Sequence, residues 1–168
     1  NYSSYATING VLRGSAIDSY TRTINLYHAF GNDYHDSFDA WENKFGESIK
    51  DFVKRTYDEA ITLNDAISRN KFIEDTTVFR GVDMNALASF GITSNDTSDE
   101  ILKKLGGVYT DNGFMSCSPI STGGFTSKSV NFVMKCKKGM SFADISKYNP
   151  KEKEILLRMG SKFSIDSV

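Results

Sequence analysis

The spacing of hydrophobic residues divides the chain into a helical first half and a second half of short strands. From Ala16 to Phe30, apolar side chains recur every three or four residues, which predicts a helix with one buried face. A second such run covers Phe38–Val53, with Asp36 placed to cap its start and Gly46 placed to kink or divide it. A third helical face continues over 57–70. The aromatic residues of these runs are expected to pack in a core.

After Glu74 the pattern changes to β-forming segments. Thr76–Val82 is rich in β-branched and aromatic residues and predicts a strand. A short helix is predicted over Ser98–Leu105, because the capping box Thr97-x-x-Glu100 precedes it and two glycines follow it. Five further segments are strand-like: Gly113–Cys117, Ser129–Cys136, Met140–Asp144, Glu154–Met159 and Lys162–Ile165. Helices grouped first and strands grouped later predict an α+β domain.

Glycine and hydroxyl residues dominate the segment Ser121–Ser129, STGGFTSKS, which lies between two predicted strands. Such a composition is typical of a mobile surface loop. Phe125 is its one aromatic residue.

Length and charge narrow the classes of function. A chain of 168 residues fits one domain with a sizeable core. The 20 basic and 21 acidic residues nearly cancel, which disfavours a nucleic-acid-binding protein with an excess of positive charge. No apolar stretch reaches the roughly 20 residues of a membrane span. Because residue 1 is Asn, we expect a domain excised from a longer or processed protein.

The cysteines and histidines form no metal-binding pattern, so no metal site is expected. Cys117 and Cys136 both lie in strand-like segments. Two buried free thiols are favoured for them, and a disulfide is the alternative. His28 and His35 are isolated in the sequence, and we expect neither to be catalytic.

Three features carry candidate chemistry, and the first two lie on predicted strands. Arg80 interrupts the apolar strand VFRG, and a buried arginine needs a carboxylate or phosphate partner. The alternative is an arginine at a strand end with its head in solvent. In GFMSCSP, the hydroxyls of Ser116 and Ser118 are two residues apart and share one strand face, while Cys117 faces the other. Hydroxyls so placed can orient another group by hydrogen bonding, although an ordinary strand end is the simpler reading.

The third feature is NPKEKEILL, in which Glu152 and Glu154 stand two residues apart before an apolar run. If the strand begins near Glu152, both carboxylates share a face and the flanking lysines point away. Two carboxylates so close suit a site that stabilises a cation and takes up a proton. By itself, such a stretch is more typical of a solvated charge run.

Taken in chain order, VFRG, FMSCS and KEKEILLRMGSKFSI resemble the Arg-Ser-Glu class of bacterial mono-ADP-ribosyltransferase toxins. The last stretch is the most specific. The iota-toxin-like, actin-modifying enzymes and the clostridial Rho-modifying exoenzymes are the nearest comparison. The N-terminal INGVLRG is similar to the helix that begins these domains, with Asn9 and Arg13 on one face. The resemblance runs from about residue 2 to residue 166.

The resemblance implies the ADP-ribosyltransferase fold, in which N-terminal helices pack on a mixed, mainly antiparallel core of two β-sheets. It also implies NAD as co-substrate and no metal. Arg80, with Gly81 beside it, would clamp the pyrophosphate, because a guanidinium fork matches phosphate oxygens. Asn9, Arg13 and Lys128 would assist at the phosphates or the adenosine ribose.

The resemblance assigns the remaining roles around the nicotinamide ribose. Ser116 would position Glu154, and Glu154 would hold a ribose hydroxyl and stabilise the cationic centre as nicotinamide leaves. Phe125 would fold over the nicotinamide. Glu152 would orient and deprotonate the acceptor, and Tyr148 would help to recognise the target protein.

In this class, a glutamate at the position of Glu152 accompanies arginine acceptors, so the resemblance implies modification of an arginine. The implied protein is a secreted or translocated bacterial toxin acting in the host cytosol, with actin as the leading candidate target and a delivery component outside this chain. Two departures are Cys117, where relatives carry threonine, and Lys128, where they often carry arginine. NAD glycohydrolysis and a catalytically inactive binding module are the alternatives. An inactive module would be expected to lack Arg80, Ser116 or Glu154, and all three are present.

Overall fold

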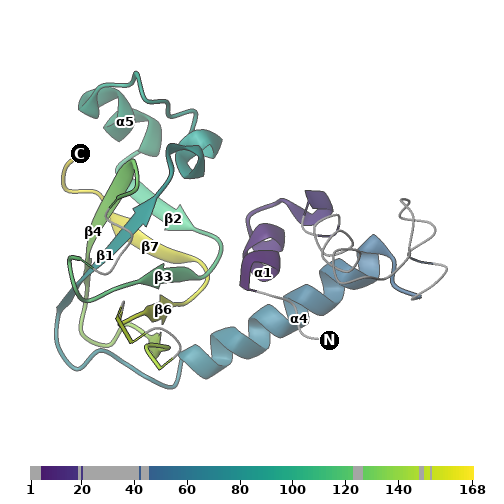
Figure 1. Cartoon of the computed structure of the whole chain (residues 1–168). Helices are drawn as coiled ribbons and strands as arrows, with labels where there is room; N and C mark the ends of the chain where they lie inside the picture. The colour runs from purple at the N-terminus through teal and green to yellow at the C-terminus, as the bar shows by residue number, and fades with distance from the viewer. Residues whose placement is uncertain are drawn as a thin grey trace. The chain divides into compact units, whose positions relative to one another are not determined.

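The computed structural model describes residues 5–18, 20, 42, 46–122, 127–147, 150–151 and 153–168, which form two compact units (Figure 1). The first unit covers residues 1–65 and the second covers residues 66–168. Among the described helices, none is long and apolar enough to cross a membrane.

Two helices organise the first unit, α1 (Tyr5–Leu12) and α4 (Ile49–Ile67). The start of α4 is capped by Ser48, whose hydroxyl accepts the Asp51 backbone N–H at 3.1 Å. The predicted division at Gly46 is confirmed, because this residue has φ 65° just before α4 begins. The separation into a second and a third helix is wrong, since α4 runs without a break through 53–57. Most of the predicted runs 16–30 and 38–45, and Asp36 with them, lies outside the described residues.

A small core in the first unit forms around Tyr20, Phe52 and Val11. The Tyr20 ring lies 5.1 Å from that of Phe52, and its hydroxyl donates to the Glu47 carbonyl. Burial, and then the negative charge of Glu47, raises the Tyr20 pKa to about 12, so this hydroxyl stays protonated at neutral pH. Arg55 lies over the Phe52 ring at 5.5 Å.

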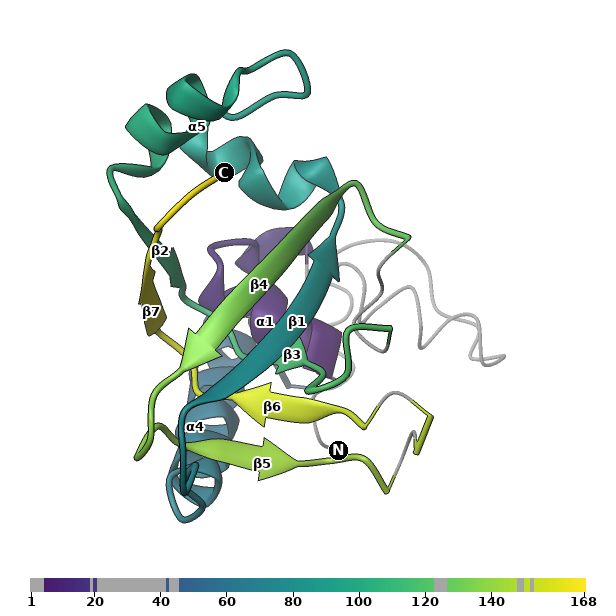
Figure 2. The same cartoon turned by 90° about the vertical axis from the view of Figure 1, so that its left-hand side faces the viewer.

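The second unit is built from antiparallel strands (Figure 2). The longest pair joins β1 (Thr76–Val82) to β4 (Val130–Cys136). A second sheet has the order β3 (Met115–Cys117), β6 (Ile155–Leu157), β5 (Phe142–Asp144), and a third pair joins β2 (Val108–Asp111) to β7 (Ser161–Ser164). Phe79 and Ser118 exchange backbone hydrogen bonds of 2.8 and 2.9 Å, which link β1 to β3. This confirms the predicted α+β class, and every pairing among the described strands is antiparallel rather than mixed.

Most helices and strands of the second unit lie where capping residues, glycines and β-forming residues in the sequence predicted them. The bounds of β1 and of α5 (Ser98–Leu105) agree with the prediction, and the capping box of α5 is formed. The 3-10 helix η1 (Met84–Phe90) and strand β2 were not predicted. Strand β3 begins later than predicted, because the Gly113 N–H bonds to the Asp111 carboxylate in a turn instead of joining a ladder.

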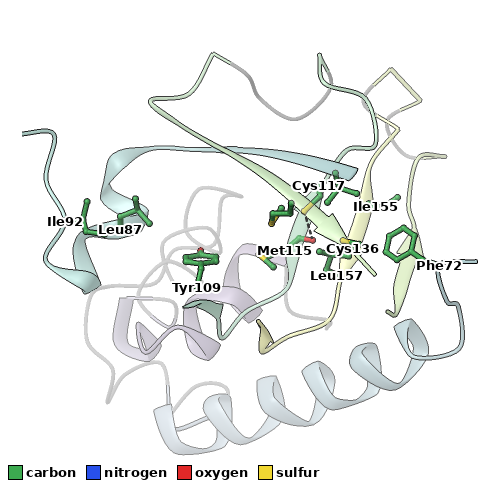
Figure 3. Close-up of a cluster of buried hydrophobic side chains, with 11 residues drawn as sticks. Phe72, Leu87, Ile92, Tyr109, Met115, Cys117, Cys136, Ile155 and Leu157 are labelled. Atoms are coloured by element: carbon green, nitrogen blue, oxygen red, sulfur yellow. Dashed lines mark hydrogen bonds between the residues drawn. The ribbon is translucent and has the colours of Figure 1, made fainter. Parts of the chain in front are cut away.

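The main core lies within the second unit and includes Met115, Cys117, Cys136 and Leu157 (Figure 3). Both cysteines are free and buried, in agreement with the favoured prediction over the disulfide. Burial raises the pKa of Cys117 to about 12 and that of Cys136 to about 11. Thiols with such pKa values are almost wholly protonated at neutral pH, so these two act as small apolar packing groups.

Candidate active site

Arg80 projects from β1 onto the backbone of β3. Its Nη1 donates a 2.7 Å hydrogen bond to the Ser116 carbonyl. This contact holds the two strands together next to the single bridge at Phe79 and Ser118. The alternative of a guanidinium reaching into solvent is therefore wrong, and Arg80 is half-buried.

The Arg80 Nε is buried and has no hydrogen-bond partner within the described part of the chain. A buried N–H of a charged group without an acceptor is costly, and such atoms are few in folded proteins. The guanidinium therefore retains a buried donor for an anionic oxygen, as a phosphate group would supply.

Ser116 and Glu154 meet across the β3–β6 pair. Ser116 pairs with Leu156 in the ladder, and its Oγ donates to Glu154 Oε1. The neighbours Met115 and Cys117 are buried while Ser116 is only half-buried, so Cys117 faces the core as the alternation predicts. The hydroxyl of Ser118 has a different role, because it accepts the Ile120 N–H at 3.1 Å in the following turn.

Glu154 stands directly before β6, where backbone pairing begins. Its carbonyl accepts the Ile145 N–H at 3.0 Å, so the residue after β5 and the residue before β6 are joined. The preceding residue, Lys153, has φ 45°, the one positive φ of a non-glycine residue in the described ranges. The side chains of Lys151 and Lys153 are exposed, as predicted. Glu152 and Tyr148 fall outside the described residues, as does Phe125.

Charged side chains of the second unit shift the pKa of the Cys117 thiol in opposite directions. Burial is the main cause of its raised pKa. The positive charge of Arg80 opposes that shift, and the carboxylates of Asp111 and Glu154 add to it. Asp111 was not a predicted site residue, although the Asp-Asn-Gly sequence is a turn signal. It is 6% exposed, and its carboxylate fixes the turn into β3.

Asn9 and Arg13 belong to the first unit. Asn9 lies within α1 and is buried, whereas Arg13 is exposed and follows the last helical residue, Leu12. The Arg13 N–H still donates to the Asn9 carbonyl at 3.0 Å, so the four-residue helical spacing holds between them.

Gly81 and Lys128 lie near the end of the β1–β4 pair at which Val82 pairs with Val130. Gly81 is buried and pairs with Asn131. The Lys128 Nζ lies 2.8 Å from the Asp83 Oδ2, an ion pair that no sequence signal indicated. Among the described residues, no three His, Cys, Asp or Glu side chains are grouped to hold a metal.

One protein-family model matches the sequence over its whole length. The sequence model of the ADP-ribosyltransferase exoenzymes matches residues 1–168. The chain belongs to this family. No curated protein matches the sequence. The toxin class inferred from the motifs is thus confirmed, while the iota-toxin-like subtype stays a prediction.

Solved structures share the fold of this family member at low sequence identity. C3stau2 from S. aureus, solved with NAD, is 17% identical, and the match covers 97% of this chain and 79% of that one with a TM-score of 0.57. C3larvin from Paenibacillus larvae is 23% identical over 97% of this chain and 89% of that one, with a TM-score of 0.53. Plx2a, an ADP-ribosyltransferase toxin from Paenibacillus larvae, is 23% identical over 67% of this chain and 61% of that one, also with a TM-score of 0.53.

Proposed function

We propose that residues 1–168 form one catalytic domain that transfers ADP-ribose from NAD to an arginine side chain of a host protein and releases nicotinamide. The observation that carries this proposal is the hydrogen bond from Ser116 to Glu154, beside an Arg80 that retains a buried donor. Membership of the ADP-ribosyltransferase exoenzyme family and the NAD bound to C3stau2 support the choice of co-substrate.

Glu154 acts at the sugar in this proposal. Ser116 engages Oε1, and among the described residues none donates to Oε2, so one carboxylate oxygen remains for a ribose hydroxyl. A fixed negative charge at this position stabilises the oxocarbenium-like transition state as the bond to nicotinamide breaks. Because Ser116 fixes the carboxylate in advance, little reorganisation is needed during the reaction.

Arg80 acts at the pyrophosphate. Its Nη1 is held by the Ser116 carbonyl, which fixes the plane of the guanidinium and leaves the buried Nε to donate to a phosphate oxygen. Lys128 adds a second positive charge at the phosphates, and Asn9 and Arg13 assist there or at the adenosine ribose.

Glu152 acts on the acceptor. The glycosidic C–N bond breaks with its electron pair going to the pyridinium nitrogen, which leaves as neutral nicotinamide. An acceptor nitrogen then bonds to the ribose carbon and must lose a proton. The guanidinium of arginine has a pKa above 12, so a carboxylate is needed to orient it and take that proton. A glutamate suits this acceptor because carboxylate and guanidinium form paired hydrogen bonds.

The target is proposed to be a host protein, with actin as the leading candidate and Tyr148 contributing to its recognition. We also propose that the enzyme acts in the host cytosol, and membership of the ADP-ribosyltransferase exoenzyme family supports this. Phe125 is proposed to shield the nicotinamide from water.

The acceptor assignment is tested by Glu152→Ala. We expect labelling of agmatine, a small guanidine acceptor, to fall by roughly 10²- to 10⁴-fold, the usual contribution of general-base catalysis. Nicotinamide release into water should stay within a few-fold, because Glu154 still stabilises the transition state. Labelled NAD and chromatography of both products measure the two rates.

Lys151→Ala is the matched control, since Lys151 is exposed and is the sequence neighbour of Glu152. It should retain both rates. Labelling of asparagine or cysteine in place of arginine would contradict the acceptor assignment. Nicotinamide release with no labelled acceptor in a host-cell lysate would assign NAD glycohydrolysis instead.

A further inference from the structure

Lys128 is paired with a carboxylate that lies on another element. Its Nζ donates a 2.8 Å hydrogen bond to Asp83 Oδ2, across 45 residues of sequence. The two side chains are 39% and 66% exposed, so ligands in solution can reach both of them. In the proposed function, the Lys128 ammonium group binds a phosphate of NAD. In this structure it is already paired with the Asp83 carboxylate.

The ion pair lies just past the end of the β1–β4 ladder. The last backbone pair of the ladder is Val82 with Val130, the next residues along the two segments are Asp83 and Ser129, and Lys128 is one residue further on. The Ser129 hydroxyl accepts the Met84 N–H at 2.9 Å. The Asn131 side chain donates to the Lys128 carbonyl at 3.2 Å. Side chains thus hold the backbone of Lys128 in place beside Asp83.

Asp83 does not perform the capping that its position would allow. It is the N-cap residue of η1, and aspartate in that position usually accepts a backbone N–H of the first turn. Here the side chain makes no capping hydrogen bond. Its carboxylate is directed to Lys128 instead.

We propose that Asp83 sets the affinity of the site for NAD, by competing with a phosphate group for Lys128. This inference rests on the proposed function, in which Lys128 contacts phosphate. Asp83 directly follows Val82, the last residue of β1. Because its Oδ2 lies 2.8 Å from Lys128 Nζ, its negative charge also repels a phosphate group that binds this lysine. Removing the charge therefore releases Lys128 from its partner and removes the repulsion of the phosphate.

The test is NAD binding by Asp83→Asn, which keeps the shape of the side chain and removes its charge. We expect the Kd for NAD to fall by about two- to fivefold at low salt, the range for a partly exposed ion pair. The difference should shrink at about 0.5 M salt, where exposed charges are screened. The affinity for nicotinamide riboside, which lacks phosphate, should not change. Lys128→Met should weaken NAD binding.

Asp75→Asn is the matched control, because Asp75 pairs with Lys137 at 3.0 Å at the opposite end of the same two strands. It removes a similar charge and should leave the Kd for NAD unchanged. Melting temperatures of all variants separate affinity from stability. An Asp83→Asn protein that is folded and binds NAD no more tightly than wild type would overturn the inference. The proposed function would still stand if the wild type releases nicotinamide, and would fail with the inference if it binds no NAD.

Discussion

Replacing Glu154 with alanine is expected to abolish both ADP-ribose transfer and NAD hydrolysis. Both reactions pass through the same cationic sugar centre, and Glu154 supplies the negative charge that the Ser116 hydroxyl holds in place. Loss of such an electrostatic contact costs roughly 10²- to 10³-fold or more in rate. Nicotinamide release measured with and without agmatine tests both reactions in one assay. Asp99→Ala, which removes an exposed carboxylate of α5, is the control and should remain fully active.

Ser116→Ala should have a smaller effect of the same kind, since Ser116 acts through Glu154. The double variant should be no slower than Glu154→Ala alone, because residues that act as a unit are not additive. If the rate losses of the two single variants multiplied in the double variant, the contact between Ser116 and Glu154 would not contribute to catalysis. A Glu154→Ala protein that is folded and retains the wild-type rate would contradict the role of this residue altogether.

Arg80→Lys is expected to weaken NAD binding by roughly 10- to 100-fold, as the loss of a charge-assisted hydrogen bond would. Lysine keeps the positive charge but lacks the planar fork, so it cannot hold the Ser116 carbonyl and a phosphate oxygen together. The variant should also lose about 1–3 kcal/mol of unfolding free energy, because the half-buried contact from β1 to β3 is broken. Isothermal titration with NAD and chemical denaturation measure the two effects.

Arg69→Lys is the control, since Arg69 is exposed and follows the end of α4. It should change neither quantity. A stable Arg80→Lys protein with wild-type affinity would show that the buried Nε does not serve the phosphates.

The sequence predicted those parts of the fold that local signals specify. The capping box and terminal glycine of α5 determine its ends, and a run of β-forming residues determines β1. In contrast, α4 was divided in two, because the sequence between Val53 and Tyr57 carries few apolar residues, yet the helix continues through it. Strand β2 is short, and it is defined by pairing with β7, whose partner residues lie 50 or more positions later. The spacing of hydrophobic residues gives no information on such a distant pairing.

The residues of the candidate site could be predicted where they belong to a sequence motif. They could not be predicted where their role depends on a contact with a residue distant in the sequence. The resemblance of the three motifs, in chain order, to the Arg-Ser-Glu class implied that Arg80, Ser116 and Glu154 belong together, and the structure joins them by two hydrogen bonds. The Asp83 partner of Lys128 could not be predicted, since ion pairing between segments 45 residues apart depends on the register of β1 against β4. The positive φ of Lys153 could not be predicted either, since no glycine stands at this position to signal it.

ADP-ribose transfer to a guanidinium group is tested most directly by the product that the wild-type protein forms with NAD and agmatine, measured by mass spectrometry. We expect free nicotinamide and ADP-ribosylated agmatine in equal amounts, beyond any hydrolysis seen without agmatine. Nicotinamide release no faster than in buffer, with agmatine unmodified, would contradict the proposed function.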